Sequence, residues 1–138
     1  MPAKDLYHEQ VKRALIKDGW TITHDPYHIA VGLRDVYIDL GAERPIAAEK
    51  DGVKVAVEIK TFRGASDVNN LENALGQYVF YRSLMSRSEP GRKLILAVPE
   101  AVYETFFQEP VARQPLEDLH VALMVFDYER EVILKWIE

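Results

Sequence analysis

The chain has 138 residues, no cysteine and a formal net charge of −5. This length suits one domain, residues 1–138, that buries its apolar side chains without disulfides, and the lack of cysteine fits a reducing cytoplasm. No apolar run approaches the ~20 residues of a membrane span, and the N-terminal Met-Pro-Ala-Lys-Asp is not a signal peptide. We therefore expect a soluble cytoplasmic protein that contacts no membrane. The acidic balance argues against a simple nucleic-acid binder, because phosphate binding depends on Lys and Arg.

The first predicted element is an amphipathic helix over residues 5–18, which ends at Gly19. Its apolar face is formed by Leu6, Val11, Ala14 and Leu15. Glu9 has two interpretations: it complements the helix dipole, or it supports a metal site. His8 and His120 are isolated in the sequence. A short strand over residues 20–23 follows, broken by Asp25-Pro26.

The segment 46–60 reads as a β-hairpin around Asp51-Gly52, a strong signal for a two-residue type I′ turn. With such a turn, the residue numbers of each opposite pair sum to 103, which places Glu43 opposite Lys60. Alternation puts Glu58 and Lys60 on one strand face and the valines on the other. If the upstream strand runs unbroken from residue 36, Asp39 shares the face of the acids; a bulge at Gly41 would reverse that.

An acid next to Glu58-x-Lys60 is an arrangement that suits a divalent metal. Two carboxylates supply hard oxygen ligands to Mg²⁺ or Mn²⁺, with Glu58 as one and Asp39 or Glu43 as the other. The metal lowers the pKa of a bound water, and Lys60 orients that water or neutralises charge during phosphodiester hydrolysis. The alternative is an exposed strand face on which Glu and Lys form solvated pairs.

A second helix is predicted from Ser66 or Asp67 to about Arg87, with an inner face formed by Val68, Leu71, Leu75, Tyr78 and Met85. Gln77 and Tyr81 lie one turn apart on it, either packed in the core or beside the metal, holding a carboxylate or the water. A buried strand over 93–98, a helix over 101–107 that stops before Pro110, and a strand pair over 121–126 and 132–137 complete the chain. The predicted fold is a mixed α/β structure with one central sheet flanked by helices.

The order α-β-β-β-α-β with Asp39 and Glu58-x-Lys60 resembles the PD-(D/E)XK superfamily, which has the restriction-endonuclease-like fold. Gln77-x-x-x-Tyr81 is similar to the motif of its RecB-like branch, and Glu9 followed by Gly19-Trp20 resembles the first helix of archaeal Holliday-junction resolvases. The sequence departs from the pattern at Pro45, which the expected register places opposite Glu58, where the resolvases have aspartate. The first metal acid is then Glu43 or Asp39.

A resemblance to the XisH family, the fdxN-element excision controlling factors, covers nearly the whole chain. It is carried by Ala14-Leu-Ile-Lys-Asp-Gly-Trp, Ala56-Val-Glu-Ile-Lys, Ala74-Leu-Gly-Gln-Tyr and Leu96-Ala-Val-Pro, among other segments. The resemblance implies a role in programmed excision of a DNA element, together with a site-specific recombinase and the small companion protein XisI. Two functions follow as hypotheses: a metal-dependent DNA endonuclease, or a non-catalytic accessory protein that binds XisI, the recombinase or DNA. A homodimer is expected by analogy with the resolvases.

Overall fold

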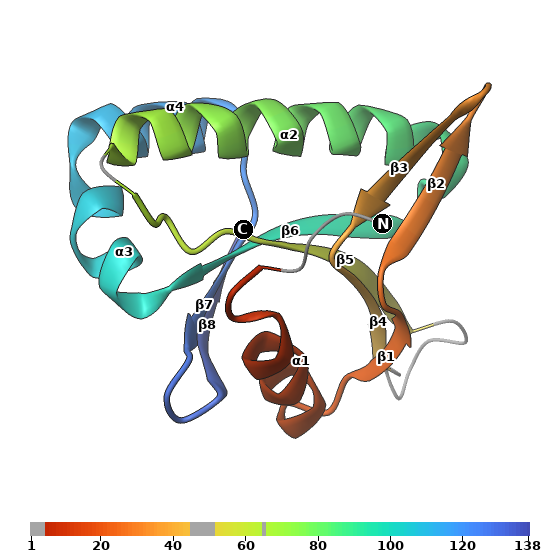
Figure 1. Ribbon diagram of the computed structural model, residues 1–138, viewed down its shortest axis with the longest axis horizontal. Helices are drawn as coiled ribbons and strands as arrows, with labels where there is room; N and C mark the ends of the chain where they lie inside the picture. The colour runs from red at the N-terminus through yellow and green to blue at the C-terminus, as the bar shows by residue number, and fades with distance from the viewer. Residues whose placement is uncertain (1–4, 45–51, 65) are drawn as a thin grey trace.

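The computed structural model describes residues 5–44, 52–64 and 66–138. Its centre is a six-stranded sheet of order β1-β4-β5-β6-β7-β8, accompanied by a separate two-stranded sheet, β2-β3 (Figure 1). The strands are β1 (Thr21–His24), β2 (Tyr27–Val31), β3 (Arg34–Ile38), β4 (Leu40–Arg44), β5 (Val53–Ile59), β6 (Arg92–Pro99), β7 (Leu123–Asp127) and β8 (Val132–Ile137). The helices are α1 (His8–Lys17), α2 (Asp67–Ser88), α3 (Glu100–Glu104), the 3-10 turn η1 (Phe106–Gln108) and α4 (Pro110–Asp118).

The central sheet is mixed. The pairs β5–β6 and β6–β7 are parallel, whereas β1–β4, β4–β5 and β7–β8 are antiparallel. Parallel neighbours need crossover connections, and α2 supplies the crossover from β5 to β6 while α3, η1 and α4 supply that from β6 to β7. Strands β5 and β6 are consequently central and buried on both faces, as their apolar sequences predict.

Helices cover both faces of this sheet (Figure 1). Helix α1 packs on one face, where its Val11 and Leu15 join a core with Val57, Ile59 and Phe126 of the strands. Helices α2 and α4 cover the opposite face over a second core, which includes Ala56, Leu96 and Tyr78. The prediction of one central sheet flanked by helices is confirmed. The inner face predicted for α2 is wrong at Val68, which is 45% exposed.

Tyr78 ties α2 to the sheet beneath it. Its hydroxyl donates to the carbonyl of Leu94 and accepts from the backbone N–H of Ala122, both at 3.0 Å. The cap of α2 is as predicted, since Ser66 Oγ accepts from Asn69 N at 3.2 Å. Among the described residues, no helix is long and apolar enough to cross a lipid bilayer.

The β2–β3 hairpin projects beyond the sheet, beside the C-terminal half of α2 (Figure 1). It turns at Gly32, whose φ of 58° lies in the left-handed region that glycine adopts without strain. Leu33 at its tip is fully exposed. Strand β2 was not predicted, and the strand upstream of the 46–60 hairpin was considered either unbroken from residue 36 or interrupted by a bulge at Gly41. Instead, the chain leaves β3 at Ile38 and enters the central sheet at Leu40, so that Ile38 and Leu40 belong to opposite cores.

The predicted register of the β4–β5 pair is wrong. Leu40 is opposite Val57 and Glu43 is opposite Lys54, so opposite residues sum to 97 rather than 103. Arg44 and Val53 are the last described pair, and residues 45–51, which include Pro45 and Asp51 of the predicted hairpin, lie outside the described part. The shift of six residues is even, and for that reason the predicted partition of β4 and β5 side chains between the two faces holds.

Helix α4 was also missed. Pro110 is its first residue rather than the end of the preceding helix, a position where proline lacks only an N–H that would be unpaired in any case. The predicted helix over 101–107 is two short elements, α3 and η1.

Candidate functional site

Asp39 stands at the point where the chain passes from β3 to β4. Continuing the β4–β5 register by one residue brings it opposite Glu58 on β5. Its Oδ2 accepts a hydrogen bond from the backbone N–H of Ile59 at 2.7 Å, which fixes the carboxylate at the edge of the ladder. The place opposite Glu58 that the predicted register gave to Pro45 is therefore held by Asp39.

Glu58 lies near the end of β5 and Lys60 directly after it. Their side chains point to the same face of the sheet. Glu58 is only 6% exposed, and Lys60 Nζ lies 3.5 Å from its Oε2. The side chain of Lys60 remains 28% exposed, so this ammonium group lies between the buried carboxylate and solvent. The backbone N–H of Lys60 donates to Ala97 O at 2.9 Å, which anchors this strand end to β6.

Burial raises the pKa of both carboxyl groups, and each responds differently to its partner. Burial, and then the charge of Asp39, raise the pKa of Glu58 to about 8, with Lys60 opposing them. Burial also raises the pKa of Asp39, although the hydrogen bond from Ile59 and the charge of His8 lower it. A cluster of buried carboxylates that one ammonium group does not neutralise favours a cation, and hard oxygen ligands favour Mg²⁺ or Mn²⁺.

Asp5 is a further acidic neighbour, which the sequence analysis did not single out. Burial raises its pKa, while the backbone N–H of Tyr7, the charge of Lys60 and a hydrogen bond with Thr61 lower it. Its own charge raises the pKa of Asp39. Asp5 thus belongs to the same electrostatic cluster, although it is 34 positions from Asp39 in the chain, and no sequence motif indicates this proximity.

His8 is not isolated, contrary to the sequence analysis. It is 3% exposed, and its Nε2 lies 2.7 Å from Asp25 Oδ1, while Lys12 Nζ donates to Asp25 Oδ2 at 2.8 Å. Ligand atoms of His8, Glu9 and Asp25 all lie within 4.8 Å of one another, a spacing compatible with a metal ion. His8 Nδ1 is buried and has no hydrogen-bond partner in the part of the chain that the structure describes. A histidine that binds a metal usually bonds a carboxylate through its other ring nitrogen, so the contact with Asp25 leaves Nδ1 as a candidate ligand atom.

Tyr81 lies on α2 within the field of the acids, and Gln77 lies one turn before it on the same helix. Burial, then the charges of Glu58 and Asp39, raise the pKa of Tyr81 to about 12, which places its hydroxyl in their field. Gln77 Oε1 is buried and finds no hydrogen-bond partner among the described residues. The alternative of a packed, satisfied amide therefore does not describe this oxygen.

Glu43 is not brought to Glu58. It lies opposite Lys54, four residues before Glu58 along β5, and its carboxylate is 3.6 Å from Arg92 Nη2 and 3.9 Å from Lys54 Nζ. Of the two acids proposed from the sequence, only Asp39 is adjacent to Glu58.

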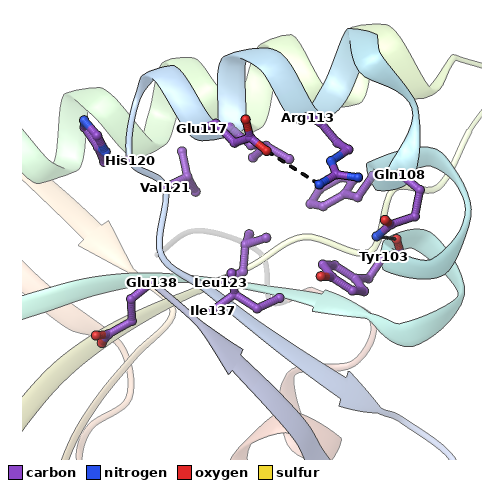
Figure 2. Close-up of a pocket in the computed structure, with 11 residues that line it drawn as sticks. Tyr103, Gln108, Arg113, Glu117, His120, Val121, Leu123, Ile137 and Glu138 are labelled. Carbon is purple, nitrogen blue, oxygen red and sulfur yellow. Dashed lines mark hydrogen bonds and ion pairs between the residues drawn. The ribbon is translucent and has the colours of Figure 1, made fainter.

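A pocket of about 340 Å³ lies between α3, α4 and the β7–β8 pair, away from these acids (Figure 2). Apolar residues such as Phe107 and Leu116 line it together with polar ones. Arg113 and Glu117 pair with each other at 3.7 Å, and Glu138 pairs with Lys93. It shares no residue with the acids of β4 and β5 and offers no comparable set of ligands.

Comparison with known proteins gives a consistent family. The family model described as XisH protein matches residues 1–134. The crystal structure of an XisH family protein from Nostoc punctiforme PCC 73102 is 41% identical, with a TM-score of 0.88, and the alignment covers 97% of this chain and 100% of that one. A crystal structure of a fdxN element excision controlling factor protein from Anabaena variabilis is also 41% identical, with a TM-score of 0.87 and coverage of 98% and 100%. No curated protein matches the chain. A family model that spans nearly the whole sequence, together with two full-length structural matches, establishes that this chain belongs to the XisH family.

Proposed function

We propose that the chain is a divalent-metal-dependent DNA endonuclease of the restriction-endonuclease-like, PD-(D/E)XK, type, acting in the excision of a DNA element. The observation that carries the proposal is the position of Asp39, directly before β4 and bonded to the backbone of β5 beside Glu58, with Lys60 directly after that strand. The family supports the context, because one structural relative is named a fdxN element excision controlling factor.

Asp39 and Glu58 would hold Mg²⁺ or Mn²⁺, with His8, Glu9, Gln77 and Tyr81 around them. When bound, the ion supplies Lewis-acid stabilisation of the phosphate and lowers the pKa of a water ligand. Lys60 would hold that water in line with the phosphorus atom and neutralise charge as the phosphodiester breaks. Tyr81 would present a protonated hydroxyl to the site at neutral pH, since its pKa is raised to about 12.

The experiment is a cleavage assay on supercoiled, linear and branched DNA with Mg²⁺ or Mn²⁺, with and without an XisI-like protein. Lys60→Ala is expected to abolish cleavage while the protein stays folded, because its side chain is partly exposed at a strand end. Lys54→Ala is the matched control, since Lys54 lies on the same strand and face but pairs with Glu43. Equal cleavage by the wild type and the Lys60 variant contradicts the mechanism.

The net charge of −5 favours a second candidate, a non-catalytic accessory protein. This protein would use the same fold to bind an XisI-like companion, the site-specific recombinase or DNA, alone or as a homodimer. Calorimetry separates the two candidates: the nuclease requires saturable Mn²⁺ binding that Glu58→Ala removes, and an accessory binder requires none. Folded protein that neither binds metal nor cleaves any substrate supports the accessory function.

A further inference from the structure

A groove of about 560 Å³ runs between strand β3 and helix α2. Asp35 and Tyr37 line it from β3, and Gly76, Gln77, Phe80 and Tyr81 line it from α2. It leads directly to the candidate metal centre, because β3 ends at Ile38, the residue before Asp39, and Tyr81 is close enough to sense the charges of Asp39 and Glu58.

The groove suits a flat, uncharged group rather than a phosphate. None of the described residues that line it is Lys or Arg, and its one charged residue, Asp35, already pairs with His28 at 2.7 Å. Three aromatic side chains line it, and Phe80 is 55% exposed although it is a large apolar residue on a helix. Exposed aromatic rings beside a backbone site are the usual platform on which nucleobases stack.

Two further features define the occupant. Gln77 Oε1 is a buried acceptor that lacks a partner within the described residues, and an acceptor of this kind is costly unless a ligand donates to it. The exocyclic amino group of a base is such a donor. Gly76 leaves the helix side of the groove open, since a Cβ there would meet no atom within 4 Å.

We propose that this groove receives an unpaired nucleobase, stacked on Phe80 and donating to Gln77 Oε1, from the DNA strand whose phosphate lies at the candidate centre. This inference rests on the proposed nuclease function, which puts the phosphate of that strand at the candidate metal centre. The substrate would then be DNA with unpaired nucleotides next to the cleaved bond. In continuous duplex both base faces are stacked, so the groove stays empty.

The test is fluorescence anisotropy with labelled DNA in Ca²⁺, so that binding is measured apart from cleavage. The probes are a single-stranded oligonucleotide, the same oligonucleotide with abasic positions, the matching duplex, and a free deoxynucleoside monophosphate as competitor. Phe80→Ala should weaken binding of the single strand by roughly 5- to 150-fold, the range for loss of one stacked base. Val79→Ala is the matched control, since Val79 is exposed beside Phe80 but does not line the groove.

Gly76→Leu supplies a variant that fills the groove without removing a contact. Its folding is expected to be preserved or improved, because leucine is favoured over glycine in a helix and the space is open. Binding of the single strand should fall, and that of the duplex should not change. Competition by the free nucleotide alone, without preference for single-stranded over abasic DNA, would make the groove a nucleotide site and overturn the substrate assignment.

The outcomes separate the two proposals. Single-strand binding that Gly76→Leu blocks, in a protein that cleaves nothing, sustains the groove assignment and removes the nuclease. Metal-dependent cleavage of duplex that neither Gly76→Leu nor Phe80→Ala alters sustains the nuclease and removes the groove assignment. Absence of any DNA binding overturns the groove assignment outright.

Discussion

Glu58→Gln should stabilise the metal-free protein at alkaline pH. Glu58 is buried beside Asp39, and its pKa rises from an ordinary 4.5 to about 8. Between these two values the unfolded chain loses a proton that the folded chain keeps, so the free energy of unfolding falls as pH rises, and the loss is complete above about pH 8. Below pH 4.5 both states are protonated and no penalty exists.

The size of this effect follows from the displacement of the pKa. About 1.4 kcal/mol accompanies each pH unit, which gives on the order of 5 kcal/mol as a ceiling at pH 8.5. Glutamine also loses the contact with Lys60, and the neighbouring carboxylates relax, so we expect roughly 2–4 kcal/mol, or a rise in melting temperature of roughly 5–15 °C. Glu58 therefore lowers the stability of the metal-free protein at alkaline pH, and a bound cation would remove this cost.

The assay is thermal unfolding in EDTA at pH 5 and pH 8.5, for wild type, Glu58→Gln and the control Glu72→Gln, which changes an exposed glutamate of α2. The wild type and the control should lose stability between the two pH values, and Glu58→Gln should lose much less. Addition of Mn²⁺ at pH 8.5 should raise the melting temperature of the wild type but not of Glu58→Gln, because a ligand that binds only the folded state stabilises it. A Glu58→Gln variant less stable than wild type at pH 8.5 would refute the reasoning.

Three further predictions concern stability and metal affinity. Tyr78→Phe should lower the free energy of unfolding by about 1–3 kcal/mol, since it leaves a buried carbonyl and a buried N–H unpaired. Gly41→Ala should cost about 1–3 kcal/mol, because the added Cβ would lie 2.8 Å from His24 Nδ1 and 3.1 Å from Tyr27 Cδ2. His8→Ala should weaken Mn²⁺ binding roughly tenfold or more in a calorimetric titration, since it removes the buried imidazole beside the carboxylates.

Controls accompany each of these changes. Gly76→Ala shows the opposite sign to Gly41→Ala if open space decides the outcome, because a Cβ at Gly76 meets nothing. Lys12→Ala, which removes the other partner of Asp25, should leave Mn²⁺ affinity close to that of the wild type. Equal Mn²⁺ affinities for wild type and His8→Ala would assign His8 a purely structural role. A Tyr78→Phe variant that melts with the wild type would mean that its two hydrogen bonds add nothing to stability.

The elements that local patterns define were predictable. The continuous apolar run of β6 and the Ser66 cap of α2 are encoded within a few residues, and both predictions are confirmed. Glu58 and Lys60 share a face because alternation along one strand is a local property. These features depend on neither loop length nor distant contacts.

The partner of Glu58 depended on a long-range register that local signals do not fix. Asp51-Gly52 is a strong turn signal, but β4 and β5 pair in a register whose residue numbers sum to 97 rather than to the 103 that this turn predicts. In the observed register Asp39 is the acid beside Glu58, and Glu43 lies next to Arg92 instead. Tertiary pairing of β4 with both β1 and β5 overrides a two-residue preference.

Other contributions to the site come from segments that no motif links. His8 and Asp25 meet across 17 residues because α1 packs against the strands that follow it, and neither residue type at that spacing signals an interaction. Pro110 shows a different failure: proline both ends and begins helices. The preceding helical segment does stop before Pro110, as predicted, but the helix that Pro110 begins was not predicted.

Asp39 divides its two oxygens between two tasks. One oxygen takes the N–H of Ile59, standing in for the main-chain carbonyl that a continuous strand would have supplied. Because this side chain replaces a main-chain acceptor, β3 can leave the central sheet while the N–H of Ile59 stays hydrogen-bonded. The same bond fixes the carboxylate to the backbone of β5. An asparagine would keep this main-chain role while giving up the charge, whereas a glutamate, longer by one methylene, would disturb both. The identity of this residue is thus set by the path of the backbone as much as by the chemistry of the site. The bend between β3 and β4 also holds the carboxylate in place.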